Sequence, residues 1–198
     1  VIDNDHFING SGHARQYGDH YRAAFELPQH YFLASARFVP KKNLFRLVNA
    51  YARYLDSVAS NVEVWDLVIL GNGPLKHELE EYISSAGVAD SVHLPGFRQY
   101  DELPVCYGLA GAFLHASTTD QWGLVVNEAM ACGLPVIVSE RCGCSPDLVV
   151  PGENGFVFDP YDEQALAWCM LKIADKDRDR IVMAEASRLV INDWTLEV

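Results

Sequence analysis

Hydrophobic positions along the chain alternate between two periods. The apolar run YFLASA at 31–36 is typical of a buried strand. Over 42–59 the apolar residues instead recur at the three- and four-residue spacing of one helix face: Leu44, Leu47, Val48, Tyr51, Leu55 and Val58. This change of period predicts a strand followed by an amphipathic helix.

The same alternation continues along the rest of the chain. Apolar runs predict further strands at 62–70, 91–97, 111–117 and 135–139, and a turn with a short strand at 152–160. Helices are predicted at 74–87, 100–110, from about 123 to 132, at 162–174 and at 180–193. Pro74 suits the first position of its helix and Gly87 the end, and Asp162 is expected to cap the helix that follows it.

Strands that alternate with helices in this way predict an α/β fold with a doubly wound, Rossmann-like parallel sheet. Such sheets bind ligands at the carboxyl ends of their strands. The candidate ligand-binding loops are therefore 37–43, 71–74, 95–100, 116–123 and 139–146. The first thirty residues are polar and show no clear period. We interpret 1–30 as a connector, 31–175 as the domain and 176–198 as a C-terminal helix.

Composition narrows the class of protein. The chain has 198 residues, of which 49% are hydrophobic, and this is enough for the core of one domain. No apolar run approaches the roughly 20 residues that a membrane span needs, and the N-terminal sequence lacks the pattern of a secretory signal. The five cysteines form an odd and scattered set, which favours a reducing compartment, and we expect a cytoplasmic protein.

The charge of the chain restricts its partners. A net charge of −12 argues against a nucleic acid or an anionic membrane, because a polyanion would be repelled. A small anionic ligand would need a local basic site. Arg37 and Lys42 lie in the first strand-to-helix loop, with Lys41 as the alternative cation. Such residues are common in solvated basic loops, but beside the helix start described next they favour a diphosphate clamp.

The segment STTDQWGLVVNEAMACGLPVIVS at 117–139 carries two acids in an apolar setting. Its helix begins near Gly123, and the unpaired amides of a helix start attract phosphate. Asp120, just before those amides, has the ordinary interpretation of a helix cap or first-turn acid. Glu128 lies on an otherwise apolar helix, where a carboxylate needs a partner, and a vicinal diol such as a ribose offers two donors.

Two other patterns are similar to metal sites. Cys142-Gly-Cys144 lacks the two-residue gap of zinc and redox motifs and has no second pair, so we interpret both as buried or loop thiols. The second pattern is an alternation of three acids, Asp175, Asp177 and Asp179. It is not a calcium loop, because Arg180 stands where that loop needs Gly and Ala186 where it needs Glu. We expect no metal.

The ordered set of motifs over about 31–175 resembles the C-terminal, donor-binding half of a retaining GT-B glycosyltransferase. The family is the large group 1, or family 4, type that includes sucrose synthase-like and mannosyltransferase enzymes. The motifs are Arg37 with Lys42 five residues on, GNGPLKHELE, VHLPGF, Asp120 with Glu128 in the segment above, and GCSPDLVVPGENGFVF. The set is far more specific than any one of its members.

The resemblance implies transfer of a hexose from a nucleotide diphosphate sugar with retention of configuration, in carbohydrate biosynthesis, without cofactor or metal. Arg37 and Lys42 would bind the donor diphosphate, Asp120 would contact the transferred sugar, and Glu128 would accept the ribose hydroxyls. The other donor-binding residues implied are Gly123, Leu124 and Val125 through their amides, Phe97 and Arg98 through the backbone near the base, and Trp122.

Some features depart from the family or leave alternatives. The family usually has Glu at the position of Asp120 and often Gly at that of Ala36. VIDNDHF resembles the segment that enters this domain from an N-terminal acceptor-binding domain. That domain would be the partner of this chain, would make any membrane contact, and would be needed for activity. The alternatives are a nucleotide-sugar epimerase or a phosphorylase of the same architecture, and a non-catalytic nucleotide-sugar-binding module.

Overall fold

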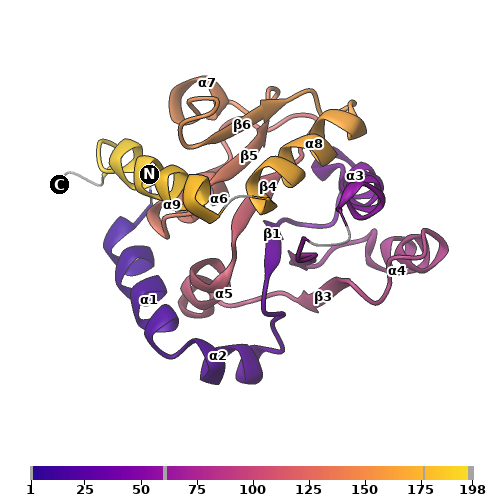
Figure 1. Cartoon of the computed structure of the whole chain (residues 1–198), viewed down its shortest axis with the longest axis horizontal. Helices are drawn as coiled ribbons and strands as arrows, with labels where there is room; N and C mark the ends of the chain where they lie inside the picture. The colour runs from indigo at the N-terminus through magenta and orange to yellow at the C-terminus, as the bar shows by residue number, and fades with distance from the viewer. Residues whose placement is uncertain (1, 60–61, 176, 196–198) are drawn as a thin grey trace.

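Six parallel strands form one sheet at the centre of the folded domain (Figure 1). The computed structural model describes residues 2–59, 62–175 and 177–195. Residues 1, 176 and 196–198, on which the predicted connector and C-terminal helix partly fall, lie outside the described residues. The strands are β1 (Tyr31–Ser35), β2 (Asp66–Leu70), β3 (Val92–Gly96), β4 (Ala112–His115), β5 (Val136–Ser139) and β6 (Gly155–Phe158). Their order, β3-β2-β1-β4-β5-β6, confirms the doubly wound, Rossmann-like prediction.

Helices cover both faces of this sheet. They are α1 (Asn4–Gln16), α2 (Gly18–Phe25), α3 (Leu44–Ser57), α4 (Lys76–Ser85), α5 (Leu103–Leu109), α6 (Leu124–Ala131), α7 (Ser145–Leu148), α8 (Glu163–Ala174) and α9 (Asp177–Ile191), with the 3-10 turns η1 (Pro40–Lys42) and η2 (Tyr100–Glu102). Successive strand residues point to opposite faces, so Leu67 and Ile69 pack with α3, α4 and α8. Val68 and Leu70 pack with α1, α5 and α6. Two cores thus hold the sheet from either side.

The strand order places a crevice beside β1. From β1 the chain winds outward through β2 to β3, and then returns to β4 on the other side of β1. The loops that leave β1 and β4 therefore diverge at the carboxyl edge of the sheet, which is where folds of this type bind ligands. This edge contains the candidate loops predicted above.

The first thirty residues differ from the irregular structure that their polar sequence predicts. Asp3 caps α1, because its carboxylate accepts a hydrogen bond from the amide of His6 at 3.0 Å. Phe7 is fully buried, and α1 packs against α5 and α6. The helical period is hidden because the buried face of α1 also carries polar residues such as Asn4. Whether this segment connects two domains stays a prediction.

Boundaries of the other elements differ by a few residues from the predicted ones. Asp162 caps α8 as predicted, accepting from the amide of Ala165 at 2.9 Å. Pro74 is not the first residue of its helix, since α4 begins at Lys76 and Pro74 lies in the turn before it. The short helix α7 was not predicted, because four residues show no helical period.

Candidate functional site

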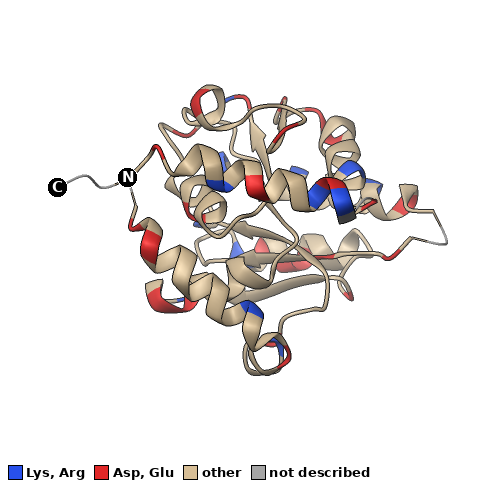
Figure 2. Cartoon of the chain, turned by 60° about the vertical axis from the view of Figure 1, so that its left-hand side comes forward, with Lys and Arg blue, Asp and Glu red and all other residues tan. Residues whose placement is uncertain are grey.

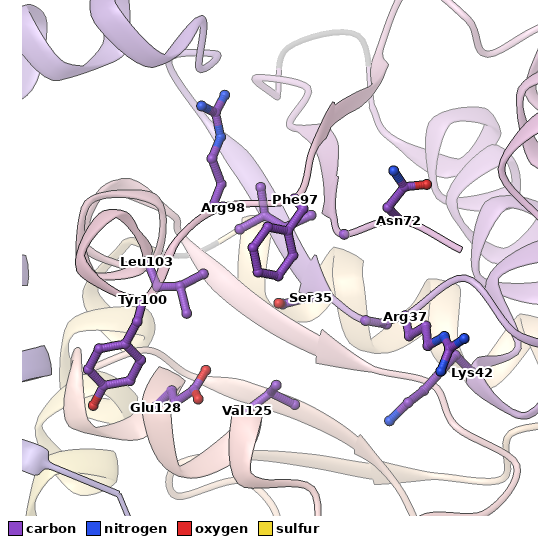
Figure 3. A pocket seen from close by; sticks show the side chains of 13 residues that line it. Ser35, Arg37, Lys42, Asn72, Phe97, Arg98, Tyr100, Leu103, Val125 and Glu128 are labelled. Atoms are coloured by element: carbon purple, nitrogen blue, oxygen red, sulfur yellow. The ribbon is translucent and has the colours of Figure 1, made fainter. Parts of the chain in front are cut away.

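A cleft of about 750 Å³ opens at the carboxyl edge of the sheet, a size typical of sites for small molecules (Figure 3). The loops after β1, β2 and β3 and the first turns of α6 line it. It brings together these predicted site residues: Arg37, Lys42, Phe97, Arg98, Val125 and Glu128. Its other lining residues are Ser35, Ala36, Leu70, Gly71, Asn72, Tyr100 and Leu103. The predicted loops 37–43, 71–74 and 95–100 therefore meet in one cleft, whereas 116–123 and 139–146 contribute no lining residue. The predicted site residues outside the lining are Asp120, Trp122, Gly123 and Leu124.

Arg37 lies on a loop whose backbone is fixed by its neighbour. The amide of Ala36 donates to the carbonyl of Leu70 at 3.0 Å, and the amide of Phe38 donates to the carbonyl of Asn72 at 2.9 Å. At Gly71 the φ angle is +127°, and a Cβ there would lie 1.9 Å from the carbonyl oxygen of Ala36. Only glycine permits this close approach, which holds Arg37 at the cleft.

Lys42 is held at the cleft by the next residue, Asn43, whose side chain is hydrogen-bonded to two other loops. Asn43 adopts a left-handed conformation, and its buried side-chain amide donates to the carbonyls of Ala116 at 3.1 Å and Pro160 at 2.8 Å. The carbonyl of Lys41 accepts from the amide of Thr118 at 2.9 Å. Of the two lysines, it is Lys42 that lines the cleft.

Asp120 forms an ion pair with Lys42. Its Oδ2 accepts from Nζ of Lys42 at 2.5 Å and from Nε2 of His115 at 3.1 Å. The hydrogen bond from His115 and the contact with Lys42 outweigh burial and hold the pKa of Asp120 well below its ordinary value. Backbone hydrogen bonds to the loop after β5, at Arg141 and Gly143, fix the position of Asp120. Asp120 is therefore a charged carboxylate in contact with one of the two predicted cations.

His115 is a site residue that the sequence reasoning missed. It is the last residue of β4, and its side chain is 3% exposed. Burial acts to lower the pKa of His115, but hydrogen bonds to Asp120 and Cys142 raise it above the ordinary value. The available signal was a histidine at the carboxyl end of a predicted strand, five residues before Asp120. Its pairing with Asp120 depends on how the loop folds back.

The two thiols of the loop after β5 lie directly behind this group. Cys142 and Cys144 are buried, as interpreted from the sequence, and their sulfur atoms are 3.4 Å apart. The hydrogen bond from Cys144, together with His115, lowers the pKa of Cys142 to about 5. Among the described residues, no group of three or more His, Cys, Asp or Glu side chains could hold a metal ion.

The start of α6 faces the cleft from the other side of Asp120. Gly123 has a φ of +97°, and a Cβ at this position would lie 2.7 Å from Sγ of Cys142 and 3.3 Å from Nε2 of His115. A glycine is thus required before the helix. Val125 lines the cleft, whereas the side chain of Leu124 does not. The amide of Val126 donates to the carbonyl of Gly123 at 2.8 Å, and the amides of Gly123, Leu124 and Val125 before it have no acceptor within the helix.

The side chain of Trp122 packs outside the cleft, against Asn127 and Trp194. Its indole Nε1 donates to Oδ1 of Asn127 at 2.9 Å, and its ring lies 4.9 Å from that of Trp194. Trp122 does not line the cleft. A direct contact between Trp122 and a donor stays a prediction.

Glu128 lies across the cleft from the two cations (Figure 3). Its Oε2 accepts from the hydroxyl of Tyr107 at 2.8 Å. Burial raises the pKa of Glu128 above its ordinary value, and the bond from Tyr107 acts in the opposite direction. Tyr107 is fully buried and was not identified from the sequence, because a tyrosine in an apolar helix is usually only a core residue. It orients the carboxylate that the sequence singled out.

Aromatic residues line the remaining wall. Phe97 is 68% exposed, and its ring projects into the cleft (Figure 3). The guanidinium of Arg98 points away from that ring, toward Phe25 at 5.2 Å and Glu102 at 3.9 Å. Tyr100 adds a second ring that was not predicted. A flat, partly apolar ligand group suits this wall.

Comparison with known proteins identifies relatives of the chain. The sequence model of the family described as glycosyl transferases group 1 matches residues 20–190. The chain is 32% identical over 128 residues to alpha-monoglucosyldiacylglycerol synthase of Acholeplasma laidlawii, covering 65% of this chain and 31% of that protein. It is 30% identical over 169 residues to the GDP-mannose-dependent alpha-(1-6)-phosphatidylinositol monomannoside mannosyltransferase of Mycolicibacterium smegmatis, covering 82% and 42%. The chain spans less than half the length of these curated relatives.

Solved structures share the fold. The C-terminal domain of the group 1 family protein LpcC from Francisella tularensis matches with a TM-score of 0.78 at 22% identity, covering 90% of this chain and 93% of that one. HepE of Anabaena, solved in complex with UDP, matches with a TM-score of 0.79 at 22% identity, covering 97% and 51%. The sheet and its helices thus correspond to the C-terminal half of a GT-B fold. The chain belongs to the group 1 glycosyl transferases.

Proposed function

We propose that this chain is the donor-binding half of a retaining glycosyltransferase, which transfers a hexose from a nucleoside diphosphate sugar to an acceptor held by another domain. The observation that carries the proposal is the arrangement of the cleft. Two cations, Arg37 and Lys42, lie on one side, and the buried carboxylate of Glu128 lies on the other. A ligand with an anionic centre and a diol fits both.

The cations and the start of α6 would bind the diphosphate. Arg37 offers a planar fork of donors, and Lys42 offers a compact charge. The amides of Gly123, Leu124 and Val125 would hold the distal phosphate at the positive end of the helix dipole. Negative charge grows on the leaving diphosphate during glycosyl transfer, so donors fixed around it stabilise the transition state.

Glu128, Phe97 and Asp120 would recognise the rest of the donor. With Oε2 held by Tyr107, the carboxylate of Glu128 is oriented to accept hydroxyls of a ribose. The backbone at Phe97 and Arg98 would face the base. Asp120 would contact the transferred hexose and, because it already holds Lys42, would exchange part of that ion pair for contacts with the donor.

We further propose that donor binding needs no divalent metal. The charge that a metal would supply is present in Arg37, Lys42 and the start of α6.

In the described residues no helix is long and apolar enough to cross a membrane.

Calorimetric titration tests the proposal. The chain is titrated with UDP, GDP and ADP and with their glucose and mannose conjugates, with magnesium and with EDTA. We expect one base to be preferred and EDTA to have no effect. Glu128→Ala is expected to weaken binding about tenfold or more, because it removes the acceptor of a bidentate contact. Glu78→Ala, an exposed acid in the first turn of α4, is the matched control and should bind as the unmodified chain does.

Retention needs the protein that contains both halves. The anomeric configuration of the product, followed by NMR during turnover, should equal that of the donor sugar. Inversion would contradict a retaining mechanism, and conversion of the donor to an epimer without acceptor would favour the epimerase alternative. Equal affinity of Glu128→Ala and the unmodified chain for every nucleotide would contradict the assignment of the cleft.

A further inference from the structure

A second hollowed region lies at the amino edge of the sheet, opposite the donor cleft. Two adjoining hollows of about 220 and 380 Å³ are lined by residues that directly precede strands, such as Gly111 before β4, Pro135 before β5 and His30 before β1. The two hollows share Arg15 and Arg180. We call this region the amino-edge groove. Its arginines are Arg15, Arg22, Arg180 and Arg188.

These arginines are unusual for so acidic a chain. The sequence has 27 Asp and Glu against 15 Lys and Arg, and Figure 2 shows the acids spread over many elements. Two acids, Asp19 and Glu185, also line the amino-edge groove. Within the described residues, however, Arg15, Arg22 and Arg188 form no ion pair with a carboxylate. The charges of Arg15 and Arg188 are therefore not neutralised by a directly bound carboxylate in the described part of the chain.

Two of the guanidinium groups meet at one turn. Arg15, from α1, donates to the carbonyl of Cys132 at the end of α6. Arg188, from α9, lies over the next residue, since a Cβ on Gly133 would be 2.4 Å from its guanidinium. Burial and the charge of Arg188 lower the pKa of Arg15, so the two cations repel each other.

Capping of helix ends explains only part of this cluster. Arg15 and Arg22 donate to carbonyls at the ends of α6 and α5, where positive charge is favourable. Arg15 also donates to Oγ of Ser11 at 3.4 Å, and Arg22 to the carbonyl of Pro28 at 2.7 Å. A guanidinium has five N–H donors, so each of these arginines keeps donors without an acceptor among the described residues. Arg188 has no hydrogen-bond acceptor among the described residues, and its side chain is exposed. Capping gives no reason for a second guanidinium at the turn formed by Cys132 and Gly133.

We propose that Arg15 and Arg188 form a second anion site, which binds a phosphate or phosphoryl group at the turn of Cys132 and Gly133. A tetrahedral anion between two guanidinium forks accepts several charge-assisted hydrogen bonds and relieves their repulsion. The site is separate from the donor cleft. The eight residues of α6 lie between them, which corresponds to about 12 Å along the helix.

Site-resolved NMR distinguishes this site from the donor cleft. The nitrogen-15-labelled chain is titrated with inorganic phosphate and with pyrophosphate. We expect the amides of Gly111 and Gly133 to shift on binding, independently of any shift at Gly123 in the donor cleft. Arg188→Gln should weaken the response at Gly133 at least tenfold. Arg178→Gln, an exposed arginine of the same helix outside the groove, should leave it unchanged.

The source of the phosphate is tested with lipid vesicles. Co-sedimentation with phosphatidic acid vesicles, but not with phosphatidylcholine vesicles, that is lost in Arg188→Gln would assign a lipid headgroup. Binding of free phosphate without binding to vesicles would assign a small phosphorylated molecule. Phosphate shifts confined to the donor cleft, or an equal response of Arg188→Gln and Arg178→Gln, would overturn the proposal. Thermal unfolding midpoints of both variants equal to that of the parent exclude misfolding as the cause.

Discussion

Asp120 reduces the positive charge that the cleft offers to a diphosphate, because it holds the ammonium of Lys42 at 2.5 Å. Asp120→Asn leaves that ammonium without its partner carboxylate. We expect affinity for the free nucleoside diphosphate to rise about two- to fivefold, since an opposing charge near the anion is removed. Affinity for the nucleotide sugar should fall instead if Asp120 contacts the hexose. Calorimetry with both ligands checks this, and equal changes for the two would refute the assigned division of roles.

Glu128 is a residue whose burial costs stability. Its pKa is raised in the folded state above the ordinary 4.5, so the folded protein binds the proton more tightly than the unfolded chain. Stability linked to this group is fully present below about pH 4.5 and is lost as pH rises through the raised pKa. Glu128→Gln removes that loss and still accepts from Tyr107.

The expected result is a Tm for Glu128→Gln that is about 2 °C higher at pH 7, with weaker nucleotide binding. The difference in Tm between variant and parent should shrink as the pH approaches 4. Differential scanning calorimetry over pH 4–8 measures it. A difference in Tm that does not depend on pH would mean that burial does not raise the pKa of Glu128.

For single residues, the sequence indicates those whose type is unusual for their local setting. It does not indicate those whose type is common in that setting. Glu128 could be found because a carboxylate in an apolar helix requires a partner. Arg37 and Lys42 could be found because cations are sparse in this chain. His115 and Tyr107 break no local rule, since their importance lies in bonds to Asp120 and Glu128 that only the folded chain forms.

The start of α6 is the element on which the cleft depends most. Gly123→Ala forces a left-handed alanine and brings a Cβ within 2.7 Å of Cys142. We expect a loss of about 2–5 kcal/mol in the free energy of unfolding, together with loss of nucleotide binding. Gly87→Ala is the matched control, because φ is +72° there and nothing lies within 4 Å. It should cost only about 1–2 kcal/mol and leave binding intact. Urea unfolding and calorimetry measure both, and similar losses for the two would contradict the close packing at Gly123.

Helix α1 packs into the core of the domain. Phe7 is fully buried, with its ring 6.0 Å from that of Tyr107, the partner of Glu128. Phe7→Ala should cost about 3–5 kcal/mol and weaken nucleotide binding through Tyr107. Ile8→Ala, at a 37% exposed neighbour, should cost less than about 1 kcal/mol. Chemical denaturation distinguishes the two, and a small loss for Phe7→Ala would contradict the packing of α1 into the core.

Helices and strands are predicted most accurately where the spacing of their apolar residues is most regular. Helix α3 and the buried strands β1 and β2 have uniform apolar patterns, and they occur where predicted, within a few residues. The pattern of α1 fails because two polar residues lie on its buried face. Asn4 donates to the distant carbonyl of Ile191, whereas Ser11 bonds locally to the carbonyl of Ile8 and lies where α1 approaches Gly108 of α5. The start of α4 is predicted too early, at Pro74 instead of Lys76, because proline suits the turn before a helix as well as the first turn of the helix.

The charge of the whole molecule affects how a donor arrives. The chain carries −12 overall, and Lys42 is paired with Asp120, so little positive field extends from the cleft. Salt should screen the long-range repulsion of a nucleoside diphosphate. We expect its association rate constant to rise about two- to threefold between 20 and 200 mM salt. Stopped-flow tryptophan fluorescence measures the rate, with the uncharged nucleoside as control. A rate that falls with salt would show that the cleft attracts anions at long range.

The central position of β1 also determines the order in which the sheet forms. Phe32 pairs with Leu67 and, on its other side, with Ala112, and the second contact closes the whole segment between residues 32 and 112. Closing a segment of this length is slow, and contacts far apart in sequence delay folding. During synthesis β1, β2 and β3 therefore emerge with one edge of β1 unpaired. Until β4 arrives, that edge is exposed to pairing with other chains, so the folding yield depends on how quickly the second half follows.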